Sequence, residues 1–431
     1  MKRSARVLAL VLTAGWAAGP LSAQNTFEDH VANLKSPNAD TREKAAEHLG
    51  KSRRQDAVTP LAAMVRDPDN DVRRAVVKAL KQLRDLSALP ALVTSMRDGD
   101  PEIRRLALEG ILEVYLEPEL VQPGFPDVFA EEFDSGPAET FAPVEPGVFE
   151  AVRVTLRDED DEVRELSAHA VGILGAEGLS GELLPSLQDP DARVRAVAAT
   201  SLARVGTSEE GASLIPLLSD EAPRVRMRAL HALGVLEVKQ AAPALRAVYE
   251  SYGRREEAVP VLITLSRLKA TELGQFFLDQ LADASLARRR LAIEGLARIS
   301  DPGVIDGFKK DFQRARNEEI RMALAFALAY LGDSAFVDTI AINLGGIGLK
   351  VRARSYLVEL GPSRLSALYP YLADPDPHVR AELCRILAEL GDPAAIARLE
   401  PLVQDSNAMV ADSANRAIER LRAVERAGSD G

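Results

Sequence analysis

The sequence predicts an all-α protein, a curved α-α solenoid of about eleven to twelve helical-hairpin repeats. The first observation is a stretch of about thirty-one residues that recurs along most of the 431-residue chain. The second is helical spacing, because small or apolar residues recur four, seven, eight and eleven positions after the start of each copy. The third is the composition, 46% hydrophobic and 27% charged, which is typical of a folded chain. Repeats of this length indicate stacked supersecondary units rather than one globular core.

Each copy begins at a position that we call its anchor, and most neighbouring anchors are 29 to 32 residues apart. The anchors are Thr41, Val72, Ile103, Val163, Val194, Val225, Glu257, Arg288, Ile320, Leu349, Val379 and Val410. Only the step from Ile103 to Val163 is doubled. Because Glu257 and Arg288 are not apolar, we expect irregular stacking around these two copies.

Glycine and proline mark the two helices of each copy. In the copy that starts at Val194, the apolar series stops at Gly206, which predicts a helix end with left-handed backbone. Glycines at the same place in other copies are Gly175, Gly332, Gly361 and Gly391. A second apolar helix is expected next, with a proline in its first turn, where the missing amide hydrogen costs little. These prolines are Pro60, Pro90, Pro185, Pro216, Pro243, Pro370 and Pro401.

Aspartate and arginine recur at fixed offsets around the anchors. Asp lies five positions before many anchors, where it should accept hydrogen bonds from free amides at a helix start. Arg follows many anchors directly, so the pairs should form a ladder of charge-assisted hydrogen bonds between neighbouring units. The predicted ladder residues are Asp67, Asp98, Asp189, Asp220, Asp374, Arg73, Arg104, Arg164, Arg195, Arg226, Arg321 and Arg380. A phosphate or carboxylate site built from these arginines is the alternative.

The order of these signals resembles HEAT repeats, and most closely the short HEAT-like repeats of the phycobilin lyases. Asp-Pro-Asp is followed by Val-Arg, by Ala and Leu up to a Gly, and then by a Leu-Pro helix. The resemblance covers residues 37–424, with residues 24–36 as a lead-in and 425–431 as a tail. It implies eleven helix pairs and a last single helix from about Ala408 to Val424, with the second helices along the concave side.

Two enzyme groups share this type of repeat. Deoxyhypusine hydroxylases bind iron through His-Glu pairs, but none of this chain's five histidines is followed by Glu. The histidines are His30, His48, His169, His231 and His378. His169 and His231 occupy matching offsets and are interpreted as packing residues, with a weak metal pair as the alternative. We therefore predict no catalytic, cofactor-binding or metal-binding residue, and keep a HEAT-like oxidoreductase or bilin-lyase type of enzyme or cofactor carrier as the alternative.

The first 23 residues have the pattern of a cleavable signal peptide. Lys2, Arg3 and Arg6 precede the apolar run 7–18, and small residues end at Ala23, after which cleavage is expected. That run is too short to span a bilayer. The interpretation is a soluble bacterial protein that is exported to the periplasm or secreted. The single cysteine, Cys384, occupies a core offset and is interpreted as a buried structural thiol.

The charge balance restricts the partners. The formal net charge is −12, and removal of three basic residues with the signal makes it about −15. An acidic chain is a poor ligand for nucleic acid, whose phosphates require clustered Lys and Arg. Membrane insertion after signal removal is not expected either.

The doubled step contains an insertion, residues 117–146, rich in proline, phenylalanine and acidic residues. From Leu106 to Val152 there are eleven acidic residues and no Lys or Arg. A surface loop without a specific role is one interpretation. The other is recognition of the solenoid's own groove or of a basic, apolar partner. In that hypothesis the anchoring residues are Phe125, Phe129, Phe133 and Phe141, and the steering residues are Glu131, Glu132 and Asp134.

A basic cluster lies later in the chain, at Arg288–Arg290 and from Lys309 to Arg316. A solvated helix face is one interpretation, and an acidic partner at Lys309, Lys310 and Arg314 is the other. Taken together, the sequence predicts a non-catalytic exported scaffold that binds a protein or peptide in the cell envelope. Self-association end to end is a further possibility.

Overall fold

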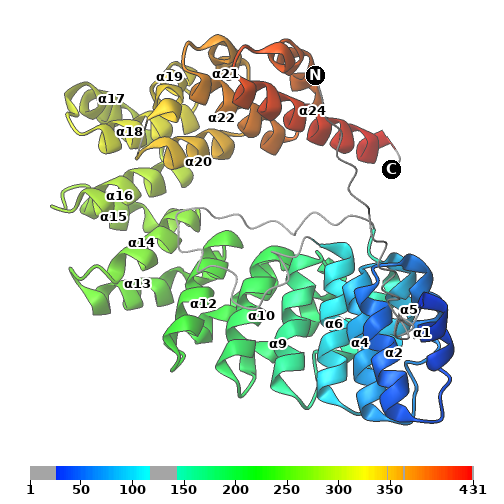
Figure 1. The fold of residues 1–431 in the computed structure, drawn as a ribbon. Helices are drawn as coiled ribbons and strands as arrows, with labels where there is room; N and C mark the ends of the chain where they lie inside the picture. The colour runs from blue at the N-terminus through cyan, green and yellow to red at the C-terminus, as the bar shows by residue number, and fades with distance from the viewer. Residues whose placement is uncertain (1–25, 117–142, 347, 363–364, 430–431) are drawn as a thin grey trace, which may run out of the picture. The chain divides into compact units, whose positions relative to one another are not determined.

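A computed structural model describes residues 26–116, 143–346, 348–362 and 365–429, and this part of the chain contains helices and no strand. The predicted all-α class is therefore confirmed. The chain divides into two compact units, Met1–Tyr115 and Leu116–Gly431 (Figure 1). The predicted signal segment, residues 1–23, lies outside the described residues, as does 117–142 of the insertion.

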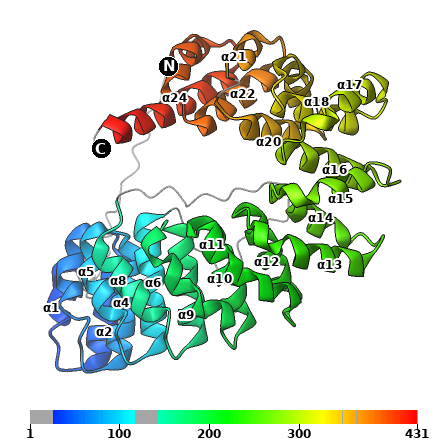
Figure 2. The ribbon, with the colours of Figure 1, turned by 180° about the vertical axis from the view of Figure 1, so that it is seen from behind.

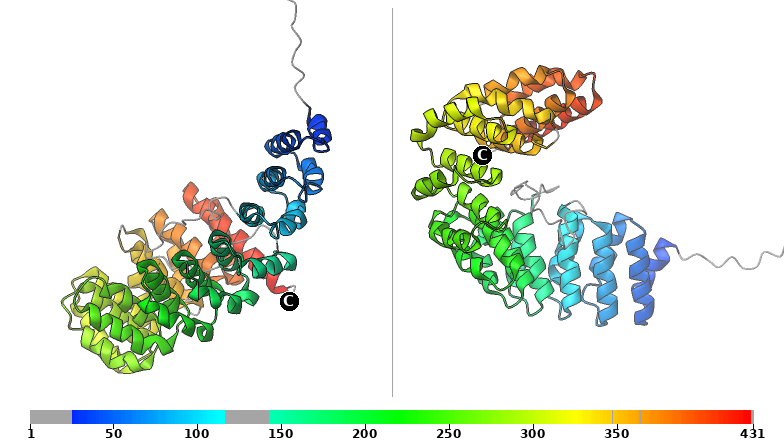
Figure 3. Two further views of the ribbon diagram at one scale, coloured as in Figure 1. Left: turned by 90° about the horizontal axis from the view of Figure 1, so that it is seen from below. Right: turned by 90° about the vertical axis from the view of Figure 1, so that its left-hand side faces the viewer.

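The described part of the first unit contains six α-helices. In chain order they are α1 (Phe27–Asn33), α2 (Ala39–Lys51), α3 (Val58–Ala62), α4 (Asn70–Leu83), α5 (Leu89–Ser95) and α6 (Pro101–Tyr115). The first helices of the copies, α2, α4 and α6, lie side by side (Figure 3). The predicted lead-in forms α1, which begins with a capping box between Thr26 and Asp29 and packs against α2.

The second unit continues the same series of first helices. They are α9 (Asp161–Ile173), α10 (Ala192–Val205), α12 (Pro223–Val235), α14 (Ala258–Arg267), α16 (Leu286–Arg298), α18 (Glu318–Tyr330), α20 (Lys350–Leu360), α22 (Pro377–Leu390) and α24 (Ala408–Ser429). Neighbouring members pack against each other along the unit (Figure 2). The apolar anchors Val163, Val194, Val225 and Val379 are all buried, so α9, α10, α12 and α22 turn their anchors toward the core.

The second element of each copy was expected to be a helix, and in several copies it is partly or wholly a 3-10 helix. The α-helical ones in this unit are α8 (Pro146–Thr155), α11 (Ser208–Gly211), α13 (Ala242–Tyr252), α15 (Gly274–Gln280), α17 (Ile305–Arg314), α19 (Val337–Ala341), α21 (Leu365–Leu368) and α23 (Ile396–Leu399). In the copy of Val163 two 3-10 helices, Glu177–Leu183 and Pro185–Gln188, replace the expected α-helix. Prolines explain part of this difference, because Pro216 lies inside the 3-10 helix Ala212–Ser219.

The helix ends correct two details of the sequence interpretation. The residue that caps a first helix lies three positions before the anchor, as in Asp69, Asp160 and Asp191, and not five positions before it. Gly391 ends α22 in the left-handed region, with φ 69°, as expected. Gly206 was expected to do the same for α10 but is extended, with φ −87° and ψ 169°. Non-glycine residues supply positive φ in other copies: Arg53, Arg84, Glu237, Lys269 and Ser300.

Close packing between first helices gives a testable prediction at two equivalent glycines, Gly172 in α9 and Gly234 in α12. A Cβ at Gly172 would lie 2.6 Å from Ser201 Oγ and 2.8 Å from Ser201 Cα, whereas one at Gly234 meets nothing nearer than 3.5 Å, at Thr264. Gly172→Ala should therefore lower stability by about 1–3 kcal/mol through overpacking. Gly234→Ala should raise it by about 0.5–1 kcal/mol, because alanine loses less backbone entropy in a helix. Thermal unfolding of both variants checks the pair, and equal effects would contradict this packing.

Candidate functional site

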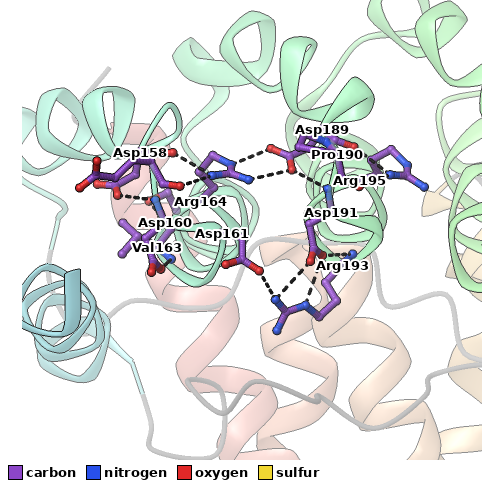
Figure 4. Close-up of polar contacts among 12 residues, drawn as sticks. Asp158, Asp160, Asp161, Val163, Arg164, Asp189, Pro190, Asp191, Arg193 and Arg195 are labelled. Atoms are coloured by element: carbon purple, nitrogen blue, oxygen red, sulfur yellow. Dashed lines mark hydrogen bonds and ion pairs between the residues drawn. The ribbon is translucent and has the colours of Figure 1, made fainter.

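The described repeats form five rungs of the predicted Asp–Arg ladder, each 25 residues apart in sequence. They are Arg42–Asp67, Arg73–Asp98, Arg164–Asp189, Arg195–Asp220 and Arg380–Asp405. In the rung drawn in Figure 4, Arg164 Nε donates to Asp189 Oδ2 at 2.7 Å and Nη2 donates to Oδ1 at 3.0 Å. Arg164 Nη1 also donates to the Asp158 carbonyl at 2.9 Å. Each such arginine thus binds its own loop and the next repeat together.

These bonds leave the ladder arginines occupied by carboxylates. Asp189 Oδ1 also accepts from the Asp191 amide at 2.9 Å, so both carboxylate oxygens are occupied, Oδ2 by Arg164 and Oδ1 by Arg164 and this amide (Figure 4). Hydrogen bonds from Arg195 hold the pKa of the Asp220 carboxyl below its ordinary value, although burial opposes this. Filled bidentate pairs of this kind favour a structural role for the ladder over an anion site.

The ladder is interrupted in the middle of the second unit. Arg226 donates to the carbonyls of Asp220 and Glu221, within its own loop. The Arg321 guanidinium lies over the Phe312 ring, 5.1 Å from its centroid. Asp374 accepts from the Asp376 amide at 2.8 Å. Arg104, in the first unit, donates to the Asp98 and Gly99 carbonyls. Arg226, Arg321 and Asp374 thus make loop or ring contacts in place of a rung.

A buried ionic network ties the first helices together where the ladder is interrupted. We call it the α16–α20 network: Arg290, Glu294, Arg298, Glu319, Arg352, Tyr356 and Glu359. Tyr356 Oη donates to Glu294 Oε1 at 2.6 Å, and Arg298 Nη1 donates to Glu294 Oε2 at 3.2 Å. Arg298 also reaches Glu359, with Nε to Oε1 at 2.6 Å and Nη2 to Oε2 at 2.9 Å. Three arginines face three glutamates, which balances the buried charge.

The network joins first helices two repeats apart, a contact that the repeat pattern does not predict. Long side chains of α16 and α20 hydrogen-bond past α18, and Phe326 of α18 stacks on Tyr356 at 4.3 Å between centroids. The expectation that second helices line the concave side stays a prediction.

A second set of first-helix side chains precedes the network along the unit. We call it the α9–α14 face: the residues three, six and ten positions after the anchors of α9, α10, α12 and α14, which share one side of each helix. Its members are Leu166, His169, Ile173, Val197, Thr200, Arg204, Arg228, His231, Val235, Pro260, Ile263 and Arg267. Three are arginines, none is acidic, and the others are mostly apolar.

The four helices that carry this face pack in order, α9 on α10, α10 on α12 and α12 on α14. Burial lowers the pKa of His231 to about 4, and the charges of Arg228, Arg267 and Arg204 act in the same direction. Burial also lowers the pKa of His169 to about 4, with a smaller effect from Arg204. Both histidines are therefore neutral at pH 7. This agrees with their interpretation as packing residues.

The predicted partner-binding residues lie in two places. Phe125, Phe129, Phe133, Phe141, Glu131, Glu132 and Asp134 are all outside the described residues. Lys309, Lys310 and Arg314 are exposed on α17, a second helix, and Lys309 Nζ lies 2.9 Å from Asp333 Oδ2. The structure does not join them to Arg288, which is buried, or to Arg290, whose side chain is 11% exposed, and both of these arginines are held in other contacts. The solvated-face interpretation is thus wrong for those two arginines.

Cysteine, metal-ligating residues and apolar helices were also searched for a site. Cys384 is fully buried, and burial raises the pKa of its thiol to about 12. Within the described ranges, no group of three or more His, Cys, Asp or Glu side chains is placed to hold a metal ion. Among the helices that the structure describes, none is both long and apolar enough to cross a membrane.

Comparison with protein families agrees with the geometry. A family model for HEAT repeats matches residues 28–112, 179–263 and 349–427, which is more than half of the chain. The chain belongs to the HEAT-repeat family. The resemblance noted in the sequence is thereby confirmed. A search of curated proteins gave no significant match.

Several solved structures are similar to this chain. The complex of CpcE and CpcF of phycocyanin lyase from Nostoc sp. is 18% identical, with 75% of this chain and 100% of that chain covered and a TM-score of 0.31. The Escherichia coli protein YibA is 17% identical, with 70% and 92% covered and a TM-score of 0.37. A chain from a study of the cadherin–β-catenin interaction is 15% identical, with 92% and 91% covered and a TM-score of 0.43.

Proposed function

We propose that this HEAT-repeat protein is a non-catalytic scaffold that is exported and binds a protein or peptide partner in the cell envelope. The observation that carries the proposal is the α9–α14 face. Its side chains are mainly basic and apolar, and they occupy the same three offsets on four first helices that pack against one another in order. Rows of this kind suit an extended polypeptide, because contacts of one type repeat along its length.

Export is the second part of the proposal, and the pattern of residues 1–23 supports it. Cleavage after Ala23 removes three basic residues and leaves Gln24 as the first residue. Gln24, rather than the cysteine of a bacterial lipoprotein, follows the proposed cleavage site, which supports a periplasmic or secreted location.

Crosslinking in the envelope, followed by mass spectrometry, tests this function. The intact protein should be recovered with Gln24 at its amino terminus and crosslinked to a discrete polypeptide partner. A protein without residues 117–145 separates the two predicted sites. Loss of the partner assigns recognition to the insertion, and its retention assigns recognition to the repeats. A chain that keeps residues 1–23, or purified protein with a stoichiometric metal or chromophore and no polypeptide partner, would contradict the proposal.

A further inference from the structure

A pocket lies on the first helices near the end of the second unit. It has a volume of about 200 Å³ and is lined by residues of α20, α22 and α24, with α22 packed against both of the other helices (Figure 2). Four of the lining residues are the arginines Arg354, Arg385, Arg416 and Arg420, and one is acidic, Glu389. Four guanidinium groups beside one carboxylate favour an anion. Pockets for drug-sized ligands have volumes of about 300–1,000 Å³, so this one suits a small anionic group.

Arg385 has hydrogen-bond donors to offer such a group. Its Nη1 donates to Glu382, and this is the one hydrogen bond that its side chain makes with the described residues. Glu382 also pairs with Lys350 Nζ at 2.9 Å, so two cations share one buried carboxylate. Arg380, a ladder residue on the same helix, instead donates to both Asp405 oxygens and to two carbonyls. Because a guanidinium group has five N–H donors, Nε and Nη2 of Arg385 can serve a ligand.

The other arginines of the pocket are held by exposed ion pairs. Arg416 is 78% exposed and pairs only with Asp412, from Nη2 to Oδ2 at 2.8 Å, among the residues that the structure describes. Arg354 Nη2 donates to Glu389 Oε2 at 2.8 Å, and both side chains are more than a third exposed. Arg420 lines the pocket one helical turn after Arg416. Exposed pairs of this kind contribute little, so their guanidinium groups can turn toward a ligand at small cost.

A buried hydroxyl in the same pocket is an independent observation. Ser413 is 6% exposed and lines the pocket, and none of the described residues hydrogen-bonds to its hydroxyl. By contrast Ser167, a buried serine of α9, donates to the Val163 carbonyl at 2.7 Å. Buried hydroxyls nearly always have a partner, so the Ser413 hydroxyl indicates that a further group completes the pocket. The small side chains of Ala388 and Ala417 leave room for that group.

The charge and the directions of the donors select the anion. A phosphoryl group has about two negative charges and three acceptor oxygens at pH 7, whereas a carboxylate has one charge and two oxygens. Guanidinium groups bind phosphate oxygens in pairs, and donors from two helices and a hydroxyl suit several oxygens better than one carboxylate.

We propose that the pocket between α20, α22 and α24 binds a phosphoryl group, as inorganic phosphate or as a phosphate ester. Arg385 and Arg416 donate to its oxygens from α22 and α24, and the Ser413 hydroxyl donates from the buried side. This site goes beyond the proposed scaffold function and does not rest on it.

The first test is titration calorimetry of the intact protein with inorganic phosphate at pH 7 and low ionic strength. Binding should saturate at one phosphate per chain, and Arg385→Ala with Arg416→Ala should weaken it by at least about tenfold. Ser413→Ala keeps every charge and should weaken it by about threefold. The matched control is Arg398→Ala with Arg422→Ala, two exposed arginines outside the pocket. The control should weaken binding by less than about twofold, because salt screens distant exposed charges.

Two calorimetric results would overturn the proposal. Equal weakening by the two double variants would show attraction by overall charge, and binding that does not saturate would show an adventitious ion only. Thermal unfolding without phosphate checks that each double variant is folded, and both should unfold at the temperature of the intact protein.

A second test uses the intact chain, so that misfolding of a variant cannot hide the answer. Phenylglyoxal modifies accessible arginines, and mass spectrometry locates the modified residues. Phosphate should slow the modification of Arg385 and Arg416 and leave the rates at Arg398 and Arg422 unchanged. The same rates at all four residues with and without phosphate, or equal protection of all four, would overturn the proposal.

Vesicles separate the two sources of a phosphoryl group. Cosedimentation with vesicles that contain phosphatidic acid, lost in Arg385→Ala with Arg416→Ala and reversed by inorganic phosphate, would identify a lipid headgroup as the ligand. Saturable phosphate binding without cosedimentation would identify a soluble phosphate or phosphate ester. Failure of phosphate binding in a protein that keeps its envelope partner would refute this site and leave the scaffold function intact.

Discussion

Replacing Glu294 by Ala should lower the free energy of unfolding by about 3–5 kcal/mol, the largest effect expected of any single substitution considered for this protein. Glu294 is 4% exposed and accepts from Tyr356, Arg290 and Arg298. Its removal leaves two arginines in a buried site with less compensating charge, and buried uncompensated charge is costly.

The matched control is Glu318→Ala, on the first turn of α18. The Glu318 side chain is 62% exposed, and its nearest ion-pair distance, to Arg321, is 3.9 Å. Its loss should change stability by less than about 0.5 kcal/mol. Urea unfolding measures both variants, and hydrogen exchange should show the added opening of Glu294→Ala between α16 and α20. Equal stabilities of the two variants would contradict the network.

The same carboxylate gives a pH dependence with a definite sign. Burial favours the neutral acid, but the charges of Arg290 and Arg298 and the hydrogen bond from Tyr356 lower the pKa of Glu294 to about 2. A depressed pKa contributes stability above the unfolded value, and this contribution is lost as pH falls from there through the folded value. The stability difference between the intact protein and Glu294→Gln should therefore shrink between about pH 5 and pH 2.

Replacing Arg195 by Ala should cost about 2–4 kcal/mol, because it removes a nearly buried rung of the ladder. Arg195 donates to both Asp220 oxygens, at 2.9 and 3.0 Å, and to the carbonyls of Asp189 and Pro190. The Asp220 side chain is 8% exposed, so its carboxylate would lose its partner away from water. Unfolding in urea checks the loss.

Arg193 is the matched control, two residues earlier on the same helix. Its side chain is 46% exposed, and its partners Asp161 and Asp191 are also partly exposed (Figure 4). Exposed ion pairs contribute little, so Arg193→Ala should cost less than about 1 kcal/mol. A cost for Arg193→Ala as large as that for Arg195→Ala would show that the ladder is not what holds these repeats together.

The fold was predictable because the same signals, an apolar anchor followed by Arg, recur in most repeats. The buried anchors Val163, Val194 and Val225, and the Arg that follows each, recur at a nearly constant interval. A ladder rung joins neighbouring copies, so its offset of 25 residues can be derived from the period. The positive φ of Arg84 and Ser300 was not predictable, because packing rather than residue type imposes it there.

The site was only partly predictable. Arg290, Glu294 and Arg298 show helical spacing in the sequence, but their partners Tyr356 and Glu359 lie 61 or 62 residues away, two repeats further on. The repeat period predicts contacts with the next copy and not with the one after it. The side-chain contact between α16 and α20 therefore had no sequence signal.

Arg288, at an anchor position, also makes contacts that the repeat pattern does not predict. It is buried although charged, because it donates to Tyr249 Oη and to the carbonyls of Gly253 and Arg255. At this anchor, where irregular stacking was expected, hydrogen bonds from Arg288 replace the apolar contact that other anchors make. Its partners lie in the copy of Val225, two before its own, at positions that carry no repeated signal.

Site-specific photocrosslinking on the α9–α14 face tests the central claim most directly. A photoreactive residue at Thr200, between Arg204 and the start of α10, should crosslink to the polypeptide partner in the envelope. The same residue at Gln313, exposed on α17, should give no such product. Absence of a polypeptide crosslink at position 200, or equal crosslinking at both positions, would contradict the account.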